Sequence, residues 1–297
     1  MGGLRVLVVD DSRIFRAAVE EALRGIAGVE IAGSVWSGDK ALEFLAAQPV
    51  DLVTLDVEMP GRDGLSTLVE IQRRPDRPAV VMLSSHTRAG APATIEALSQ
   101  GAFDFIAKPA TADPAESRRL LDADLRRVVT ALRQRGARPE PPAVPVMVAR
   151  RSPPPVGGAG GAIDVVAIGC STGGPKALRD LLPDLCAVVK QPIVIVQHMP
   201  PGFTASLAEN LGRRCPGTEI CEAAEGLGVL PGTVRLAPGG RHLVVRREAG
   251  RLVCGLTDGA PENGCRPAVD VLYRSLVSCC GGRVLAIILT GMGEDGT

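Results

Sequence analysis

Residues 51–56 read Asp-Leu-Val-Thr-Leu-Asp, a short apolar run that is closed by a carboxylate. The run at residues 4–9 is likewise followed by the acidic pair Asp10–Asp11. A third run, residues 103–107, is followed by Lys108. Apolar runs of this length are typical of strands buried on both faces of a parallel sheet. Because the carboxyl ends of parallel strands meet at one edge, where ligands bind, the three runs predict one charged site there.

The first half of the chain repeats a strand-then-helix pattern five times. The predicted strands are residues 4–9, 30–35, 51–55, 79–83 and 103–107. The stretches between them are amphipathic, as in residues 12–24, where Ser12 can cap a helix whose apolar residues recur at helical spacing. The pattern predicts an α/β domain of the flavodoxin-like kind, with a five-stranded parallel sheet covered on both faces.

A charge-rich helix over about residues 116–135 ends this half and runs into a stretch rich in proline and glycine. Such a composition cannot bury a core, so it predicts an extended tether. We therefore expect domains over residues 1–135 and 163–297, joined by a linker over residues 136–162. The strands expected in the second domain are residues 164–168, 193–196, 219–222, 234–236, 242–247, 252–256 and 284–289. This domain is predicted to be doubly wound α/β with one antiparallel hairpin.

The length and composition of the chain exclude some classes of protein function. At 297 residues the chain is long enough for two domains that each bury a core. Lys and Arg balance Asp and Glu at 33 each, and aromatic residues make up 2%, so the charge and stacking surfaces of a nucleic-acid binder are missing and a protein partner is expected. No export signal or run of ~20 apolar residues is present, which predicts a cytoplasmic protein with reduced cysteines and no membrane insertion.

The first predicted site has the chemistry of phosphoryl transfer. Asp10, Asp11 and Asp56 would repel one another without a hard cation between them, and oxygen ligands suit Mg²⁺. The cation would align a phosphoryl donor for attack by Asp56, the central carboxylate. Lys108 could then pair with the phosphoryl oxygens, and Ser84 could hydrogen-bond one of them. The alternative is that the acidic pair only caps a helix, which the convergence of three strand ends disfavours.

The second predicted site has the chemistry of a serine hydrolase. Residues 169–173 read Gly-Cys-Ser-Thr-Gly, and they follow a strand and open a helix, a geometry that exposes Ser171 beside backbone N–H groups. His198 closes the strand at residues 193–197, and Asp295 follows a third strand. We predict that Ser171 attacks an acyl carbon, His198 transfers its proton, and Asp295 orients the imidazolium.

Other reactive side chains rank lower. His242 is either a second base or substrate contact, or a solvated hairpin residue. His86 is expected to face the second domain or solvent. Cys170 is expected to point into the core, and Cys279–Cys280 to pack at a helix end.

The first half resembles the receiver domain of two-component response regulators over about residues 4–130. The resemblance rests on Asp10–Asp11, Asp56 with Met59-Pro60-Gly61, Asp63-Gly64, Ser84-Ser85 and Lys108-Pro109. It implies that a histidine kinase phosphorylates Asp56, and that Mg²⁺ is held by Asp11, Asp56, the backbone carbonyl of Glu58 and, through water, Asp10. It also places Phe105 where the family has an aromatic switch residue.

The whole chain resembles the chemotaxis protein-glutamate methylesterase (CheB) family. The matching motifs of the second half are Ser171-Thr172-Gly173-Gly174, Gln197-His198-Met199-Pro200, Ala237-Pro238-Gly239, residues 266–270 and residues 289–296. The resemblance implies a phosphorylation-activated enzyme, without a cofactor for the ester chemistry, that hydrolyses glutamyl methyl esters on the cytoplasmic helices of chemoreceptors. Many members also deamidate glutamines. It further implies that the amides of Thr172 and Met292 bind the oxyanion, and that the unphosphorylated receiver covers the catalytic crevice.

The sequence departs from this family at two places. Cys265 stands where members commonly carry histidine before Arg-Pro, which puts a substrate or support contact in doubt. The family continues beyond Thr297, so we expect the strand at residues 284–289, whose pattern indicates burial on both faces, to lack its cover and the chain to have lower stability and activity. The alternative function is a phosphorylation-dependent adaptor whose truncated esterase half is inactive. Transcriptional output is disfavoured because no helix-turn-helix pattern or basic stripe follows the tether.

Overall fold

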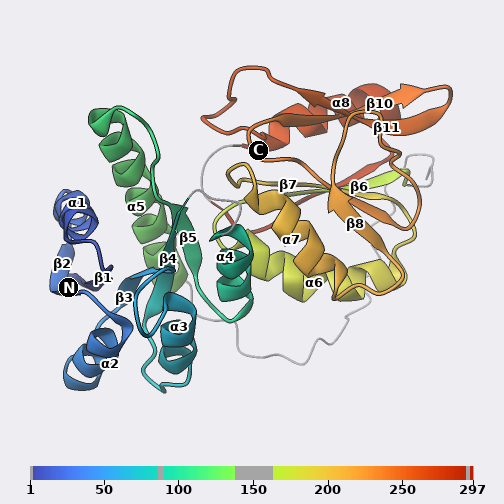
Figure 1. Cartoon of the computed structure of the whole chain (residues 1–297). Coiled ribbons are helices and arrows are strands. Elements are labelled where there is room, and N and C mark those ends of the chain that lie inside the picture. Colours follow the sequence, from blue (N-terminus) through green and yellow to red (C-terminus); the bar gives the residue numbers. More distant parts are fainter. Residues whose placement is uncertain (1–2, 86–89, 138–162, 292–294, 297) are drawn as a thin grey trace.

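The computed structural model describes residues 3–85, 90–137, 163–291 and 295–296. Two α/β halves pack side by side (Figure 1). The strands of the first half are β1 (Leu4–Val9), β2 (Val29–Val35), β3 (Leu52–Asp56), β4 (Ala79–Ser84) and β5 (Asp104–Ala107). They form one sheet in the order β2-β1-β3-β4-β5, and every neighbouring pair is parallel. The predicted five-stranded parallel sheet is thus confirmed.

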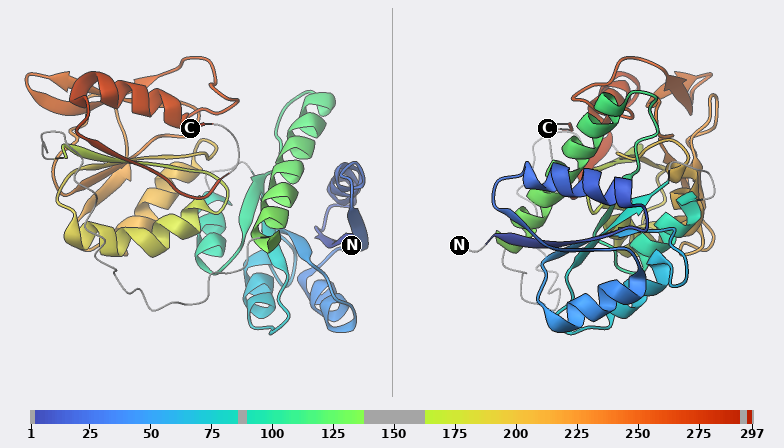
Figure 2. Two further views of the ribbon diagram at one scale, coloured as in Figure 1. Left: turned by 180° about the vertical axis from the view of Figure 1, so that it is seen from behind. Right: turned by 60° about the vertical axis from the view of Figure 1, so that its left-hand side comes forward.

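Helices cover both faces of this sheet. They are α1 (Arg13–Arg24), α2 (Gly38–Ala47), α3 (Gly64–Gln72), α4 (Gly90–Ser99) and α5 (Pro114–Ala137). Helices α1 and α5 contact each other on one face, and α2, α3 and α4 lie on the other, as Figure 2 shows. The side chain of Ser12 accepts a hydrogen bond from the amide of Phe15, so it caps α1 as its sequence position predicts.

The second half has the same layered plan with an added hairpin. Its parallel sheet has the order β12-β6-β7-β9-β8, built from β6 (Val165–Cys170), β7 (Ile193–Gln197), β8 (Glu219–Glu222), β9 (Thr233–Leu236) and β12 (Val284–Ile288). One face carries α6 (Gly174–Val188) and α7 (Phe203–Gly212). The other carries α8 (Val269–Cys280) and the antiparallel pair β10 (His242–Glu248) and β11 (Arg251–Thr257).

The exposure of strand β12 agrees with the expectation that it lacks a cover, while its position at the sheet edge was not predicted. Its sequence predicts burial on both faces, but it is an edge strand in which Leu285 is 45% exposed and Ile288 is 48% exposed. Among the described elements, α8 packs on one side of it, where the hydroxyl of Tyr273 donates to the carbonyl of Ile287 at 2.8 Å. An apolar run alone does not tell a central strand from an edge strand.

Two further expectations concern the linker between the halves and the absence of a membrane-spanning helix. The proline- and glycine-rich linker predicted over residues 136–162 lies, from residue 138 onward, outside the described residues. Helix α5 itself extends to Ala137. Within the described part of the chain, no helix combines the length and the apolar character that crossing a bilayer requires.

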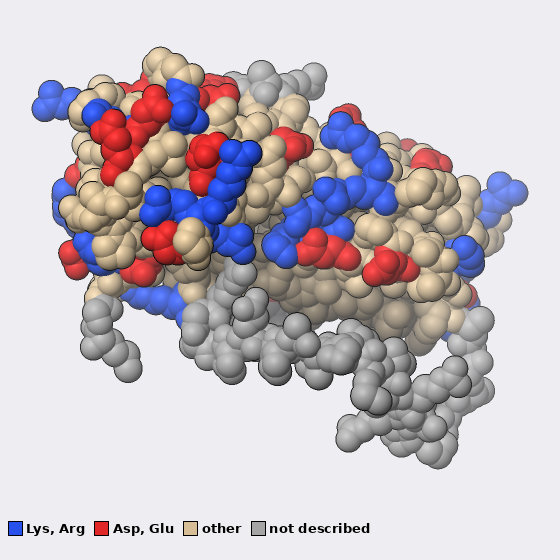
Figure 3. All heavy atoms as spheres, turned by 90° about the horizontal axis from the view of Figure 1, so that it is seen from below, with Lys and Arg blue, Asp and Glu red and all other residues tan. Residues whose placement is uncertain are grey.

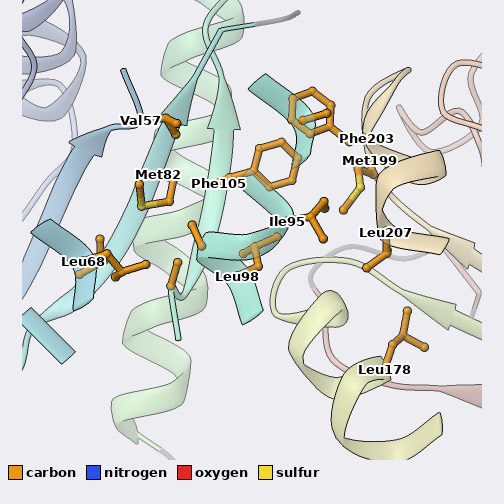
Figure 4. Close-up of a cluster of buried hydrophobic side chains, with 14 of the residues drawn as sticks. Val57, Leu68, Met82, Ile95, Leu98, Phe105, Leu178, Met199, Phe203 and Leu207 are labelled. Carbon is orange, nitrogen blue, oxygen red and sulfur yellow. The ribbon is translucent and has the colours of Figure 1, made fainter. Parts of the chain in front are cut away.

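An apolar core runs across the boundary between the two halves. The ring centroids of Phe105 on β5 and Phe203 on α7 are 4.7 Å apart. In Figure 4 these rings point toward each other, with Ile95 and Leu98 of α4 facing Leu207 of α7. Because all five side chains are buried, separating the halves would expose this surface to water, which costs about 25 cal/mol per Å² of apolar area. The two halves therefore form a specific interface in this structure.

The surface carries both signs of charge. On the face seen in Figure 3, lysine and arginine side chains are interspersed with aspartate and glutamate. Exposed ion pairs such as Lys176–Asp180, with atoms 2.6 Å apart, contribute only ~0–1 kcal/mol each. Side chains of both signs are therefore neighbours on the part of this face that the structure describes.

Candidate active site and phosphorylation site

Asp56, the predicted phosphoacceptor, ends β3 and is almost fully buried. Nζ of Lys108 lies 2.8 Å from Oδ2 of Asp56 and 2.7 Å from Oδ2 of Asp10. Burial raises the pKa of Asp56 to about 6, although the hydrogen bond from Lys108 opposes the shift. Burial alone would lower the pKa of Lys108, but its bonds to the two carboxylates raise it overall. The structure thus brings the predicted lysine and two predicted carboxylates into direct contact.

The acidic cluster has the donors that Mg²⁺ prefers. Ligand atoms of Asp10, Asp11 and Asp56 lie within 4.8 Å of one another. Asp10 and Asp56 are buried while Asp11 is exposed, so one side of the cluster meets solvent, and Mg²⁺ usually keeps several waters. The N–H of Glu58 donates to Oδ1 of Asp56 at 3.3 Å, which places this residue beside the cluster. The residues present therefore fit the ion.

The two predicted switch residues lie on the neighbouring strands. Ser84 ends β4 and is fully buried, and its Oγ accepts a hydrogen bond from Oγ1 of Thr94 on α4 at 2.7 Å. No hydrogen bond between Ser84 and Asp56 is present in the described part of the chain. Phe105 packs on Phe203 of the second half. Ser84 thus contacts α4, and Phe105 contacts α7 of the second half.

Gly64, the first residue of α3, allows this helix to lie close to the main chain of Asp56. A Cβ at this position would lie 2.0 Å from the carbonyl oxygen of Asp56, so the main chain would have to shift. We expect Gly64→Ala to lower the free energy of unfolding by about 1–3 kcal/mol, as other overpacked sites do. The matched control is Gly282→Ala, because a Cβ there meets nothing within 4 Å. Thermal melts of the two variants would test this, and equal melting temperatures would contradict the close approach.

Ser171, the predicted nucleophile, occupies the turn between β6 and α6. Gly173 has a φ of +75°, which glycine adopts without steric cost, and the amide of Gly174 donates to the Ser171 carbonyl at 2.7 Å. The Ser171 amide donates to the carbonyl of Thr290 at 2.9 Å. Nε2 of Gln197 donates to the Ser171 carbonyl at 3.0 Å. The main chain of the turn is therefore held by both neighbouring strand ends.

His198 and Asp295 are joined as predicted. Nε2 of His198 lies 2.7 Å from Oδ2 of Asp295. The carboxylate also accepts hydrogen bonds from the amides of Val269 at 2.7 Å and Asp270 at 3.0 Å, in the first turn of α8. Burial alone would raise the pKa of Asp295, but the bonds from His198 and the two amides lower it below its usual value. A helix N-terminus also favours a negative charge, so Asp295 is held ionised against the imidazole.

Ser171 and His198 are neighbours, but their side chains are not bonded in this structure. They follow the parallel strands β6 and β7, whose last paired residues are Cys170 and Gln197. Neighbouring strands lie about 4.8 Å apart, so the main chains of the two residues lie side by side at one sheet edge. Within the described ranges, no hydrogen bond links the Ser171 hydroxyl to the ring, and Nδ1 of His198 lies 3.6 Å from Sγ of Cys265 instead.

The contacts of His198 favour the protonated form of its ring. Burial alone would lower the pKa of His198, but its bonds to Asp295 and Cys265 raise it to about 9. A ring that is already protonated cannot take the proton of a serine hydroxyl. In the arrangement shown, the two ring nitrogens of His198 contact Asp295 and Cys265.

The structure settles several lower-ranked candidates. His242 is not solvated: it is buried, Nδ1 accepts from the Ala268 amide at 3.1 Å, and Nε2 lies 3.0 Å from the Ala260 carbonyl oxygen. With both nitrogens engaged by main chain, it is neither a hairpin surface residue nor a free base. Cys170 is buried as expected, and burial raises the pKa of its thiol, which makes it inert at neutral pH.

The remaining predicted residues fall into two groups. Thr172 is buried beside Ser171, and its carbonyl accepts a hydrogen bond from Oγ1 of Thr290 at 3.0 Å. Cys279 and Cys280 lie at the end of α8 with their sulfurs 3.6 Å apart, as their helix-end position predicts. Met292 and His86 lie outside the described residues.

Polar contacts tie the first half to the nucleophile turn. Arg127 of α5 pairs with Asp104 at 2.8 Å and donates to Oγ1 of Thr172, the residue after Ser171. Arg179 of α6 donates to the carbonyl of Ser99 at the end of α4. Sequence reasoning missed these arginines, because each lies on a charged helix among several similar residues. Gln197 donates a hydrogen bond to the Ser171 carbonyl. The sequence signal for this contact was a glutamine at the end of an apolar run, directly before His198.

The fold and the family matches define a class of protein: a response regulator whose effector domain is a hydrolase. Models of two known families match the chain, "Response regulator receiver domain" over residues 6–118 and "CheB methylesterase" over residues 166–297. The chain is 40% identical over 310 residues to "Protein-glutamate methylesterase/protein-glutamine glutaminase" of Desulfotalea psychrophila, covering 100% of this chain and 85% of that protein. A protein of the same name from Azospirillum brasilense is 41% identical, over 99% of this chain and 79% of its own.

A solved structure, the CheB methylesterase catalytic domain of Thermotoga maritima, is 42% identical and covers 46% of this chain and 72% of its own, with a TM-score of 0.44. The full-length relatives show the family. The chain belongs to the protein-glutamate methylesterase/protein-glutamine glutaminase (CheB) family, with an N-terminal receiver domain.

Proposed function

We propose that this protein is a phosphorylation-activated methylesterase that hydrolyses glutamyl methyl esters of chemoreceptors to glutamate and methanol during chemotactic adaptation. The observation that carries the proposal is the 2.7 Å contact of His198 with Asp295 at the strand end next to Ser171. His198 and Asp295 are in contact there, and Ser171 follows the neighbouring strand β6. Deamidation of glutamine would use the same groups, because an amide carbonyl is attacked in the same way.

The reaction follows from these groups. The Ser171 hydroxyl attacks the ester carbonyl while His198 takes its proton, and His198 then returns the proton to the leaving methoxide. Water repeats the sequence on the acyl-enzyme and releases glutamate. Asp295 keeps the imidazolium oriented and compensates its charge. The Thr172 amide and the amide of Met292 are our candidates for the oxyanion site, and a single donor of this kind is worth ~10²–10³ in rate.

The receiver domain is proposed to regulate access. The Arg127 and Arg179 contacts hold α4 and α5 against the nucleophile turn and α6 in the arrangement described above. A phosphoryl group on Asp56 would draw Lys108 and Ser84, and Ser84 is bonded to Thr94 of α4. Charge added at a strand edge can bias a bistable interface in this way. Bound Mg²⁺, held by Asp10, Asp11, Asp56 and the main chain at Glu58, would neutralise the carboxylates and orient the phosphoryl group.

The setting follows from the substrate. We place the enzyme in the cytoplasm, with a chemotaxis histidine kinase as phosphoryl donor and the methylated helices of chemoreceptors as substrate. The receiver is assigned to residues 1–135, the linker to 136–162 and the methylesterase domain to 163–297. No nucleic-acid partner is proposed.

Release of methanol from receptor carrying radiolabelled methyl esters tests the function. We expect acetyl phosphate with Mg²⁺ to raise the initial rate of the wild-type protein at least about fivefold, the lower end of typical coupling between two sites. Asp56→Asn should keep its own basal rate whether or not the donor is present. Asp76→Asn is the control, because this exposed carboxylate pairs only with Arg74 in the described structure and should leave the activation intact.

The same assay separates the enzyme from the alternative adaptor. An adaptor would bind methylated receptor in a phosphorylation-dependent manner and release no methanol under any condition. Activation of the Asp56→Asn variant equal to that of the wild type would instead remove the phosphorylation site from the mechanism.

A further inference from the structure

The imidazole of His198 has a contact that ester hydrolysis does not use. Nδ1 lies 3.6 Å from Sγ of Cys265, while Nε2 is bonded to Asp295. One ligand atom from each of these three residues lies within 4.8 Å of the other two. A thiol and an imidazole beside a carboxylate are donors typical of Zn²⁺ sites, whereas Mg²⁺ takes oxygen ligands.

The spacing of the sulfur and the nitrogen matches a shared ion. With Zn–S near ~2.3 Å and Zn–N near ~2.05 Å, a tetrahedral ion separates its two ligand atoms by about 3.6 Å. The observed separation of Sγ and Nδ1 is 3.6 Å, which equals the separation expected for two ligands of one ion. Asp295 holds the opposite nitrogen, as carboxylates commonly hold metal-binding histidines.

The surroundings of Cys265 keep its sulfur in place. Its amide donates to the Glu262 carbonyl at 2.8 Å, and its carbonyl accepts from the Glu262 amide at 3.0 Å, which closes a tight turn. Cys265 and His198 are both partly exposed, so an ion can reach them from solvent. Binding would release the thiol proton of Cys265 and the Nδ1 proton of the imidazolium to solvent and form one Zn–S and one Zn–N bond, with water in the remaining positions.

We propose that Cys265 and His198 form a binding site for Zn²⁺ or another thiophilic divalent cation, and that the bound ion inhibits the esterase by holding the imidazole away from Ser171. The inhibition rests on the proposed function, because it assumes that His198 is the base. The binding of the ion does not.

Binding is tested with Co²⁺ as the probe, on the full chain and in excess Mg²⁺ so that the receiver carboxylates are occupied. We expect one equivalent of Co²⁺ to produce a thiolate-to-cobalt charge-transfer absorption that Zn²⁺ abolishes. Cys265→Ser and Cys265→Ala should both lack the absorption. Cys279→Ser should retain it, because among the described residues Cys279 belongs to no group of three close ligand side chains, whereas Cys265 does. Circular dichroism melts would verify that each variant is folded.

Inhibition is tested by methanol release under the same conditions. Loss of an outer partner of a bound metal typically costs ~10–100-fold in affinity, so loss of a direct ligand in Cys265→Ser should raise the half-inhibiting Zn²⁺ concentration at least about tenfold. A chelator should restore the wild-type rate. An unchanged absorption in the folded Cys265 variants, or equal inhibition of wild type and Cys265→Ser, would overturn the site. A Cys265-dependent absorption in a protein that releases no methanol would leave the metal site standing and remove the esterase function.

Discussion

Ser171→Ala is expected to lower the rate of methanol release by roughly 10³- to 10⁶-fold, because loss of the nucleophile in a serine hydrolase costs up to about 10⁶ in kcat. The turn around Ser171 is held by main-chain hydrogen bonds and by Gln197, none of which uses the hydroxyl. The variant should therefore fold and bind methylated receptor as the wild type does. Methanol release and receptor co-sedimentation, measured on the same preparation, would separate the chemistry from binding.

Two controls make this result specific. Cys170→Ala tests the neighbouring thiol, which is buried and donates to the Val196 carbonyl, so esterase activity should be retained. Ser278→Ala removes an exposed hydroxyl from α8 and should have no effect on the rate. If Cys170→Ala were as inactive as Ser171→Ala while still folded, the nucleophile would be misassigned. If Ser171→Ala kept its full rate, the hydrolase mechanism would be wrong.

The strand ends explain why so much of the two sites could be predicted from sequence. Asp56 and His198 each close a short apolar run, and in parallel sheets the ends of such runs share one edge. Lys108 and Ser171 follow the same rule. Their neighbours in space are set by strand order, and a repeated strand-then-helix pattern allows few strand orders. Local periodicity was therefore enough to bring these residues together.

Contacts between elements could not be predicted in this way. Asp295 accepts hydrogen bonds from two amides at the start of α8. This contact depends on where α8, which precedes Asp295 in the chain, begins in space. Cys265 was visible only as a departure from a family pattern, and its approach to His198 depends on the path of an irregular loop. The exposure of Leu285 agrees with the expectation of an uncovered strand, but the place of β12 at the sheet edge is not encoded in its apolar sequence.

Arg179→Ala is expected to raise the basal esterase rate roughly tenfold or more, until the rate of the fully activated enzyme is reached. Arg179 is only 15% exposed and donates to the Ser99 carbonyl across the domain boundary. A hydrogen bond from a charged group contributes about 1.5–3 kcal/mol, and this one exists only while α4 is docked on α6. Its loss should therefore shift the equilibrium toward the undocked form by a corresponding factor. The measurement is the initial rate of methanol release without a phosphoryl donor.

Lys176→Ala is the matched control for this variant, because both side chains lie on α6 and pair with Asp180, but only Arg179 reaches the receiver. Its basal rate should equal that of the wild type. Activation by acetyl phosphate should shrink in Arg179→Ala, since phosphorylation and the substitution release the same contact and cannot do so twice. If instead both variants had the wild-type basal rate and full activation, docking of α4 would not be what restrains the enzyme. Control would then have to act at Arg127, which contacts the turn of the nucleophile directly.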